Sequence, residues 1–111
     1  MSSSDEITLQ QPGYTVQHES TPAGGRYYIT LGDGLETAEL TWRHSDNGSI
    51  TAEHTYVPPS HRGHGLANLL VARLMDDART NDWRVVPACS YVLAEARRNP
   101  QWQALTANRP T

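Results

Sequence analysis

The chain has 111 residues, enough for one domain with a single hydrophobic core. Its formal net charge of -3 lacks the basic excess of nucleic-acid-binding domains, and its single cysteine excludes an internal disulfide framework. Mean hydropathy is -0.62, and no apolar run approaches the length of a membrane span. Because the N-terminal residues also lack the features of a secretory signal, we expect a cytoplasmic protein. We also expect a monomer or weak dimer, without nucleic-acid or membrane partners.

The first half of the chain predicts a polar tail followed by strands. Residues 1–12 are expected to form a flexible tail, and residues 13–111 a single domain. Alternation of apolar and polar residues predicts four strands, over 14–19, 26–31, 35–43 and 50–57. A dense turn cluster is expected over 20–25. Asp46-Asn47-Gly48 is a hairpin signal, so the strands on either side of it should pair antiparallel.

The second half predicts helices and one more strand. A long amphipathic helix is indicated by apolar residues that recur at the spacing of one helical face: Ala67, Leu70, Val71, Leu74 and Ala78. A short strand over 83–86 should follow, then a helix over 91–98. Asn99-Pro100 is typical of a helix start and predicts a last short helix through Leu105. Together these elements predict an α+β fold.

The turn before the long helix carries the most informative pattern. Ser60-His61-Arg62-Gly63-His64-Gly65 places two glycines where a helix begins, so backbone N–H groups can approach a ligand without hindrance from Cβ atoms. The N-terminal end of a helix dipole favours negative charge. The pattern is neither the dinucleotide fingerprint nor a phosphate-binding P-loop, because the third glycine of the first and the Gly-Lys-Ser/Thr of the second are missing. It predicts an anion-binding site.

Arg62-Gly63-His64-Gly65-Leu66-Ala67 resembles the acyl-CoA-binding motif of the GNAT acetyltransferase superfamily, Arg/Gln-x-x-Gly-x-Gly/Ala. Together with His54-Thr55-x-Val57-Pro58 upstream, and with residues 86–92 and Arg98-Asn99-Pro100 downstream, the chain resembles the minimal, single-domain GNAT-like N-acetyltransferase family over roughly residues 26–105. The resemblance implies a GNAT-like antiparallel sheet with a crossover helix, a V-splayed fifth strand and C-terminal helices.

The same resemblance implies a function. We expect an N-acetyltransferase that moves acetyl from acetyl-CoA to an unidentified amine; the alternative is a CoA-binding regulatory or interaction module without significant catalysis. Contacts with CoA are expected from the end of the fourth strand and from the loop: Tyr56, Val57, Arg62, Gly63, His64, Gly65, Leu66 and Ala67. Arg98 is a further candidate for contact with the CoA phosphates.

His54 and Glu53 are the candidate general bases. An imidazole titrates near neutral pH, which suits proton removal from an amine, and a carboxylate could do the same directly or through water. If no bulge intervenes, alternation places His54 on the face of Ile50 and Ala52, with Glu53 on the other face. A structural, hydrogen-bonded role for His54 stays open, and so does a bulge in this strand.

Cys89 is the third candidate. It lies between Pro87 and a predicted helix N-terminus, which favours a thiolate, so it could accept an acetyl group covalently. The resemblance implies a position near the CoA sulfur, whereas the alternative is a small residue packed in the core. A metal set of His54, His61, His64 and Cys89 lacks the spacing of a zinc motif, and we expect no metal.

Overall fold

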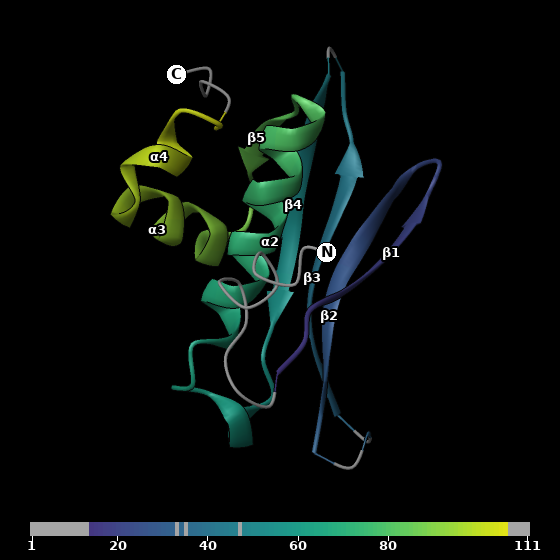
Figure 1. Cartoon of the computed structure of the whole chain (residues 1–111), viewed down its shortest axis with the longest axis vertical. Coiled ribbons are helices and arrows are strands. Elements are labelled where there is room, and N and C mark those ends of the chain that lie inside the picture. The colour runs from purple at the N-terminus through teal and green to yellow at the C-terminus, as the bar shows by residue number, and fades with distance from the viewer. Residues whose placement is uncertain (1–13, 33, 35, 47, 107–111) are drawn as a thin grey trace, which may run out of the picture.

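The computed structural model describes residues 14–32, 34, 36–46 and 48–106. The predicted boundary between a tail at 1–12 and a domain at 13–111 lies outside these residues. The elements along the described chain are β1 (Gln17–Thr21), β2 (Gly24–Leu31), β3 (Glu36–His44), β4 (Ser49–Tyr56), the 3-10 helix η1 (Pro59–His61), α2 (Leu66–Asn81), β5 (Arg84–Pro87), α3 (Ser90–Arg98) and α4 (Pro100–Gln103) (Figure 1).

The strands form one sheet in sequence order, with β1 to β4 antiparallel and β5 parallel to β4. This confirms the predicted α+β fold, in which α2 is the crossover helix between the two parallel strands. β5 pairs with β4 only as far as Ala52, while β4 continues to Tyr56. β5 ends at Pro87, the partner of Ala52, so β4 runs on beyond it, in keeping with the predicted V-shaped split.

The connection between β1 and β2 is shorter than the predicted turn cluster over 20–25, so that prediction is wrong at both boundaries. β1 continues to Thr21 and β2 begins at Gly24, which pair directly across a short connection. The two glycines of β2 are required by close packing against β3. A Cβ atom on Gly24 would lie 2.3 Å from the carbonyl oxygen of Trp42, and one on Gly25 would lie 2.9 Å from the Trp42 ring. Local composition favours a turn here, but only the neighbouring strand shows that the glycines belong to the sheet.

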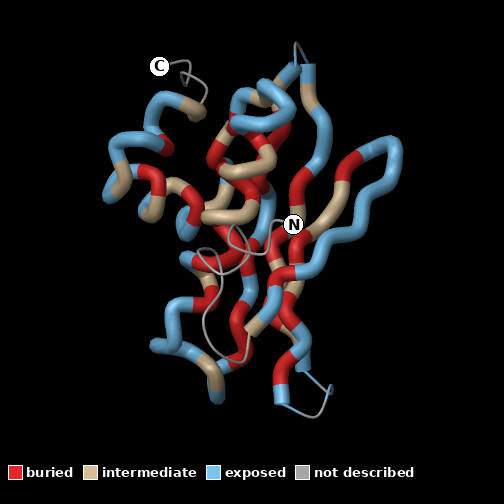
Figure 2. Tube along the Cα trace, viewed as in Figure 1, coloured by how far each residue is buried: buried red, intermediate tan, exposed pale blue. Residues whose placement is uncertain are grey.

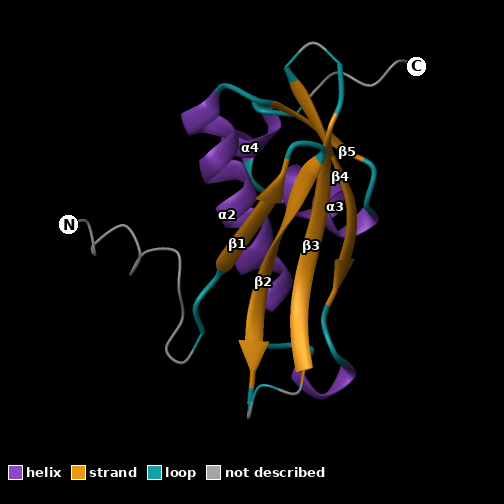
Figure 3. Ribbon diagram, turned by 90° about the vertical axis from the view of Figure 1, so that its right-hand side faces the viewer, coloured by secondary structure: helices purple, strands orange, loops and turns teal. Residues whose placement is uncertain are grey.

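The helices lie on one side of the sheet, and Figure 3 views the sheet from the other side, which no described segment covers. We call this uncovered side the open face. Helix α2 buries the predicted stripe against the sheet, with Leu70, Val71, Leu74 and Ala78 fully buried, whereas Ala67 is only partly buried. Buried residues accordingly concentrate between α2 and the strands (Figure 2).

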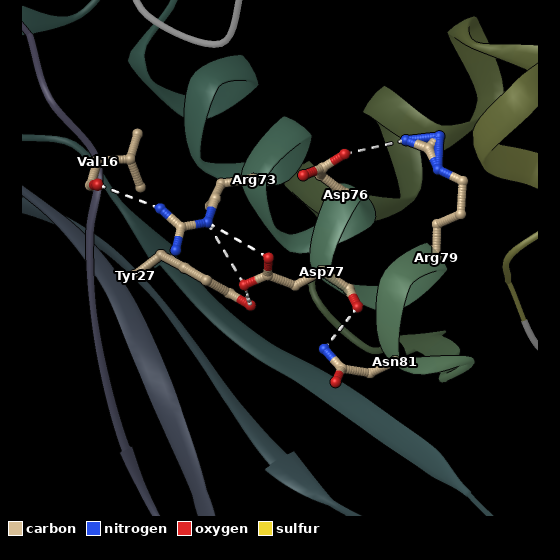
Figure 4. A network of polar contacts seen from close by, with 7 residues as sticks. All are labelled: Val16, Tyr27, Arg73, Asp76, Asp77, Arg79 and Asn81. Atoms are coloured by element: carbon tan, nitrogen blue, oxygen red, sulfur yellow. Dashed lines mark hydrogen bonds and ion pairs between the residues drawn. The ribbon is translucent and has the colours of Figure 1, made fainter. Parts of the chain in front are cut away.

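A polar network fastens α2 to β2 and to the residue that precedes β1 (Figure 4). The hydroxyl of the fully buried Tyr27 donates to Asp77 Oδ2 at 2.8 Å, and Arg73 Nε lies 3.4 Å from the same carboxylate. Arg73 Nη1 also donates to the carbonyl of Val16 at 3.3 Å. Burial, followed by the nearby Asp77 carboxylate, raises the pKa of Tyr27, so its hydroxyl stays a neutral donor. The network thus joins three segments that are distant in the sequence.

No helix among the described residues is long and apolar enough to cross a membrane. The cytoplasmic location and the monomeric or weakly dimeric state stay predictions.

We expect Tyr27→Phe to lower the free energy of unfolding by about 2 kcal/mol, because a hydrogen bond to a charged acceptor is lost inside the fold. Urea denaturation monitored by circular dichroism measures this change. Tyr28→Phe is the matched control, since it removes a hydroxyl from the adjacent residue of the same strand, which faces the open side. Equal stabilities of the two variants would contradict a stabilising role for the network.

Candidate functional site

The N-terminus of α2 presents free hydrogen-bond donors. Gly65 is its N-cap and has no side chain with which to cap the helix, and the first turn contains no acidic residue. The first backbone N–H groups of any helix lack partners within the helix, and they carry the positive end of its dipole. This arrangement fits an anionic group of a ligand.

The loop before α2 depends on backbone conformation and on one arginine. Gly63 and Gly65 have φ values of 87° and 78°, a left-handed conformation that favours glycine. A Cβ atom on Gly63 would meet nothing within 4 Å, so the conformation of the backbone, not lack of space, calls for glycine there. Arg62 Nε donates to the carbonyl of Val57 at 2.9 Å and ties the loop to the end of β4.

A pocket of about 150 Å³ lies where this loop and the start of α2 meet α3. Its lining comprises Val57, His61, Arg62, Gly63, Gly65, Leu66, Ala67, Asn68, Tyr91 and Glu95. Asn68 Nδ2 donates to Glu95 Oε1 at 2.9 Å and links the two helices across it. The volume is below the usual range for a whole cofactor. It has room for only one segment of a molecule as large as CoA.

Six of the eight residues predicted to contact CoA line this pocket. The other two, Tyr56 and His64, are exposed outside its lining, and Tyr56 lies on the open face. Arg98 does not line the pocket either, because its guanidinium bonds to Glu95 Oε2 at 3.5 Å and is 62% exposed.

Three lining residues were not predicted from the sequence: Asn68, Tyr91 and Glu95. His61 belongs to the predicted anion-binding turn, although it was not among the predicted CoA contacts. For Asn68 a signal exists, since it follows the motif directly in the first turn of α2. Tyr91 and Glu95 reach the pocket only because α3 packs beside α2, and nothing local in their sequence predicts this contact.

A β-bulge in β4 determines where the candidate bases point. Thr41 of β3 pairs with His54, but the next residue, Trp42, pairs with Ala52, which leaves Glu53 as an extra residue. Alternation therefore reverses at the bulge. The bulge that the sequence left open is present, so His54 does not share a face with Ala52 as an unbroken strand would require: Ala52 is buried beneath the helices and His54 is exposed on the open face.

Glu53 and His54 differ in their surroundings. Arg43 Nε donates to Glu53 Oε2. Arg43 lies opposite Thr51, in the part of β4 that is still paired with β5. The carboxylate of Glu53 is thereby held away from the opening between the strands. The His54 ring makes no hydrogen bond to any described residue, so both of its nitrogens are free for a ligand. Of the two candidate bases, His54 is therefore the one whose side chain is not engaged by another described residue.

Cys89 lies at the point where β4 and β5 part. It is the N-cap of α3, and its N–H donates to the Ala52 carbonyl at 3.1 Å, close to the last rung of the parallel pairing. Its half-buried thiol donates to the hydroxyl of Thr55 at 3.3 Å. Thr55 is buried on the helix side, so Cys89 and His54 approach β4 from opposite faces. Thr55 was not among the site residues predicted from the sequence.

The four residues considered for a metal site do not come together. Among the described residues, no group of three or more His, Cys, Asp or Glu side chains is placed to hold a metal ion. His61 and His64 lie near each other, with ring centroids 6.4 Å apart, but His54 and Cys89 lie elsewhere.

Comparison with known proteins agrees with this geometry. Two solved structures share the fold: a GCN5-like putative N-acetyltransferase from Staphylococcus aureus (TM-score 0.68, 21% identity, 90% of this chain and 94% of that one) and a putative acyl-CoA N-acyltransferase from Klebsiella pneumoniae (TM-score 0.61, 19% identity, 80% and 83%).

Sequence relatives point the same way. Protein NATD1 of Gallus gallus is 24% identical over 110 residues, covering 99% of this chain and all of the relative. An L-methionine sulfoximine/L-methionine sulfone acetyltransferase of Salmonella typhimurium is 49% identical over 53 residues, 47% of this chain but only 26% of that enzyme. A family model described as GCN5-related N-acetyl-transferase matches residues 26–105, most of the chain. The chain therefore belongs to the GCN5-related N-acetyltransferase family.

Proposed function

We propose that this protein transfers an acetyl group from acetyl-CoA to an amine, and that the helix side of the sheet holds the cosubstrate while the open face receives the amine. The observation that carries the proposal is the uncapped N-terminus of α2, which lies beside the end of β4 at the V-shaped split. Free donors for phosphate and an unpaired strand edge for amide groups occur together there.

The residues fit CoA in two parts. The N–H groups from Gly63 to Ala67 would bind the pyrophosphate, with the remaining N–H groups of Arg62 available to its oxygens. Beyond Ala52, the edge of β4 has no strand partner in β5, so its backbone groups can pair with the amides of the pantetheine arm. The thioester would then lie at the split, near Cys89.

The opposite-face arrangement of His54 and Cys89 favours direct transfer. The amine nitrogen attacks the thioester carbonyl from the open face, the C–S bond breaks, and CoA leaves as the thiolate, which takes its proton from water. His54 accepts the proton that the amine loses. An amine on the open face is separated by β4 from a thiol on the helix side, so a two-step route through Cys89 would need the acyl group to change faces.

A non-catalytic CoA-binding module is the alternative function, and the exposure of His54 on an uncovered face favours it. The two functions differ in whether acetyl-CoA is consumed when amines are added. Binding of CoA without turnover of any amine would support the module.

We expect Gly65→Val to abolish CoA binding, because a β-branched residue strains the left-handed backbone by about 1–2 kcal/mol and crowds the N-terminus of α2. Gly48→Val is the matched control, since Gly48 has a similar φ of 75° in the hairpin between β3 and β4, away from the pocket. Isothermal titration calorimetry should detect CoA binding to Gly48→Val and the wild type only. Unchanged binding by folded Gly65→Val would place the site elsewhere.

His54→Gln should lower the acetyl-transfer rate by about 100-fold, as expected for loss of a general base, without weakening CoA binding. The wild-type rate should rise with pH through the neutral range, since the amine must lose a proton, and His54→Gln should change this profile. Glu53→Gln should keep most of the rate because its carboxylate is engaged by Arg43. The reverse ranking of the two variants would make Glu53 the base.

We expect Cys89→Ala to keep CoA binding and most of the transfer rate, because direct transfer makes no bond to sulfur. Intact mass spectrometry of the wild type after incubation with acetyl-CoA should show no stable acetyl adduct. An adduct that is lost in Cys89→Ser, together with a matching loss of activity in both variants, would instead establish a covalent intermediate on Cys89.

A further inference from the structure

Three side chains form a row across the open face and end beside His54. Tyr28 of β2 pairs with Glu39 of β3, and Glu39 pairs with Tyr56 of β4, so the three project from one face on adjacent strands. We call Tyr28, Glu39 and Tyr56 the cross-strand row. It consists of a carboxylate between two aromatic rings, a combination that favours cations through charge and through the ring faces.

The Tyr28 and Glu39 part of this row already binds a cation, the guanidinium of Arg26. The Arg26 guanidinium lies 4.3 Å from the centre of the Tyr28 ring, and its Nη1 donates to Glu39 Oε1 at 2.9 Å. Its Nε donates to Glu19 on β1 at 3.1 Å. Two carboxylates and one guanidinium leave one negative charge on this part of the face. The protein's own side chain thus shows that the row accepts a positive group.

The Glu39 and Tyr56 part of the row binds no further cation among the described residues. The Oε2 atom of Glu39 makes no hydrogen bond to any described residue, and the Glu39 side chain remains 30% exposed. Tyr56 is 41% exposed on the last residue of β4. A second cation can therefore lie between Glu39 and Tyr56 without displacing Arg26.

The Glu39 and Tyr56 part of the row lies at a defined distance from the proposed base. His54 and Tyr56 belong to the same strand and face the same side, two residues apart, which corresponds to about 7 Å along the strand. A short alkyl spacer covers such a distance. A nitrogen beside His54 and a second, protonated nitrogen at Glu39 and Tyr56 would both be accommodated by one linear molecule.

We propose that the acceptor is a linear aliphatic diamine or polyamine, whose distal ammonium group binds between Glu39 and Tyr56 while its other nitrogen reaches His54. The inference rests on the proposed function for the transfer itself, but the ammonium site can be tested without turnover. Arg26 and Glu19 anchor the row from β1 and β2, and they hold the Glu39 carboxylate in place.

The binding test compares putrescine with butylamine, which has the same carbon chain and lacks the second nitrogen. Nuclear magnetic resonance titration of the protein without acetyl-CoA should show putrescine shifting the amide signals of Glu39 and Tyr56, and binding about tenfold tighter than butylamine. Equal affinity for the two amines would overturn the inference.

The variants separate the row from the general charge of the face. Glu39→Gln should weaken putrescine binding about tenfold and raise the KM for putrescine without changing kcat, while the KM for butylamine stays the same. Glu19→Gln is the matched control, because it also removes a carboxylate bonded to Arg26 but lies on β1, with β2 and β3 between it and β4. Equal losses in the two variants would overturn the inference.

The aromatic part is tested by substitution at Tyr56. Tyr56→Leu should lose the preference for putrescine, and Tyr56→Phe should restore it, because a cation binds to the ring and not to the hydroxyl. A lysine-containing peptide that binds this face more tightly than putrescine would overturn the polyamine as occupant. Turnover of butylamine and putrescine at equal efficiency would overturn the inference and leave the proposed function standing. Failure of CoA to bind would contradict the proposed function, while the titration still decides the ammonium site.

Discussion

One extra residue in β4 determines which face of the sheet the side chains at the end of this strand occupy. Glu53 has no partner of its own in β3, so the strand takes an additional step and its alternation reverses. Ala52 and Thr55 both face the helices, although an unbroken strand would place residues three positions apart on opposite sides. His54 and Tyr56 are consequently directed to the open face, where an acceptor can reach them.

The bulge lies beside the point where β5 ends. Together the two features separate a helix side of the candidate site from an open-face side. Pairing of the parallel strands ends at Ala52, next to the residue that begins the bulge. On the helix side the split is bordered by Cys89, and beyond it by the loop that precedes α2. On the open face it is bordered by His54. A thioester lying in the split would be accessible from both sides, which is why the proposed transfer can keep the cosubstrate and the amine apart.

The position of the candidate anion site depends on how α2 is held. A helix N-terminus is useful for binding phosphate only if it points at the right place, and α2 is fixed at both of its ends. Arg62 ties the preceding loop to the last residues before the turn, through the carbonyl of Val57. Nearer its C-terminal end, Asp77 and Arg73 join the helix to Tyr27 of β2 and to Val16, the residue before β1. The apolar stripe of α2 packs against the sheet and is buried.

The sequence by itself determined the order of the elements, the apolar stripe of α2 and the glycine-containing loop that precedes it. These features are local: periodicity repeats within one segment, and the glycines and Arg62 act on the backbone beside them. Tertiary structure alone decided the rest. The bulge arises from pairing with β3, so the composition of β4 could not predict that His54 and Ala52 would face opposite sides. Tyr91 and Glu95 enter the pocket because α3 packs on α2, and the cross-strand row exists only when three strands lie in register. Contacts between distant segments depend on the whole chain having folded, which is why no local pattern encodes them.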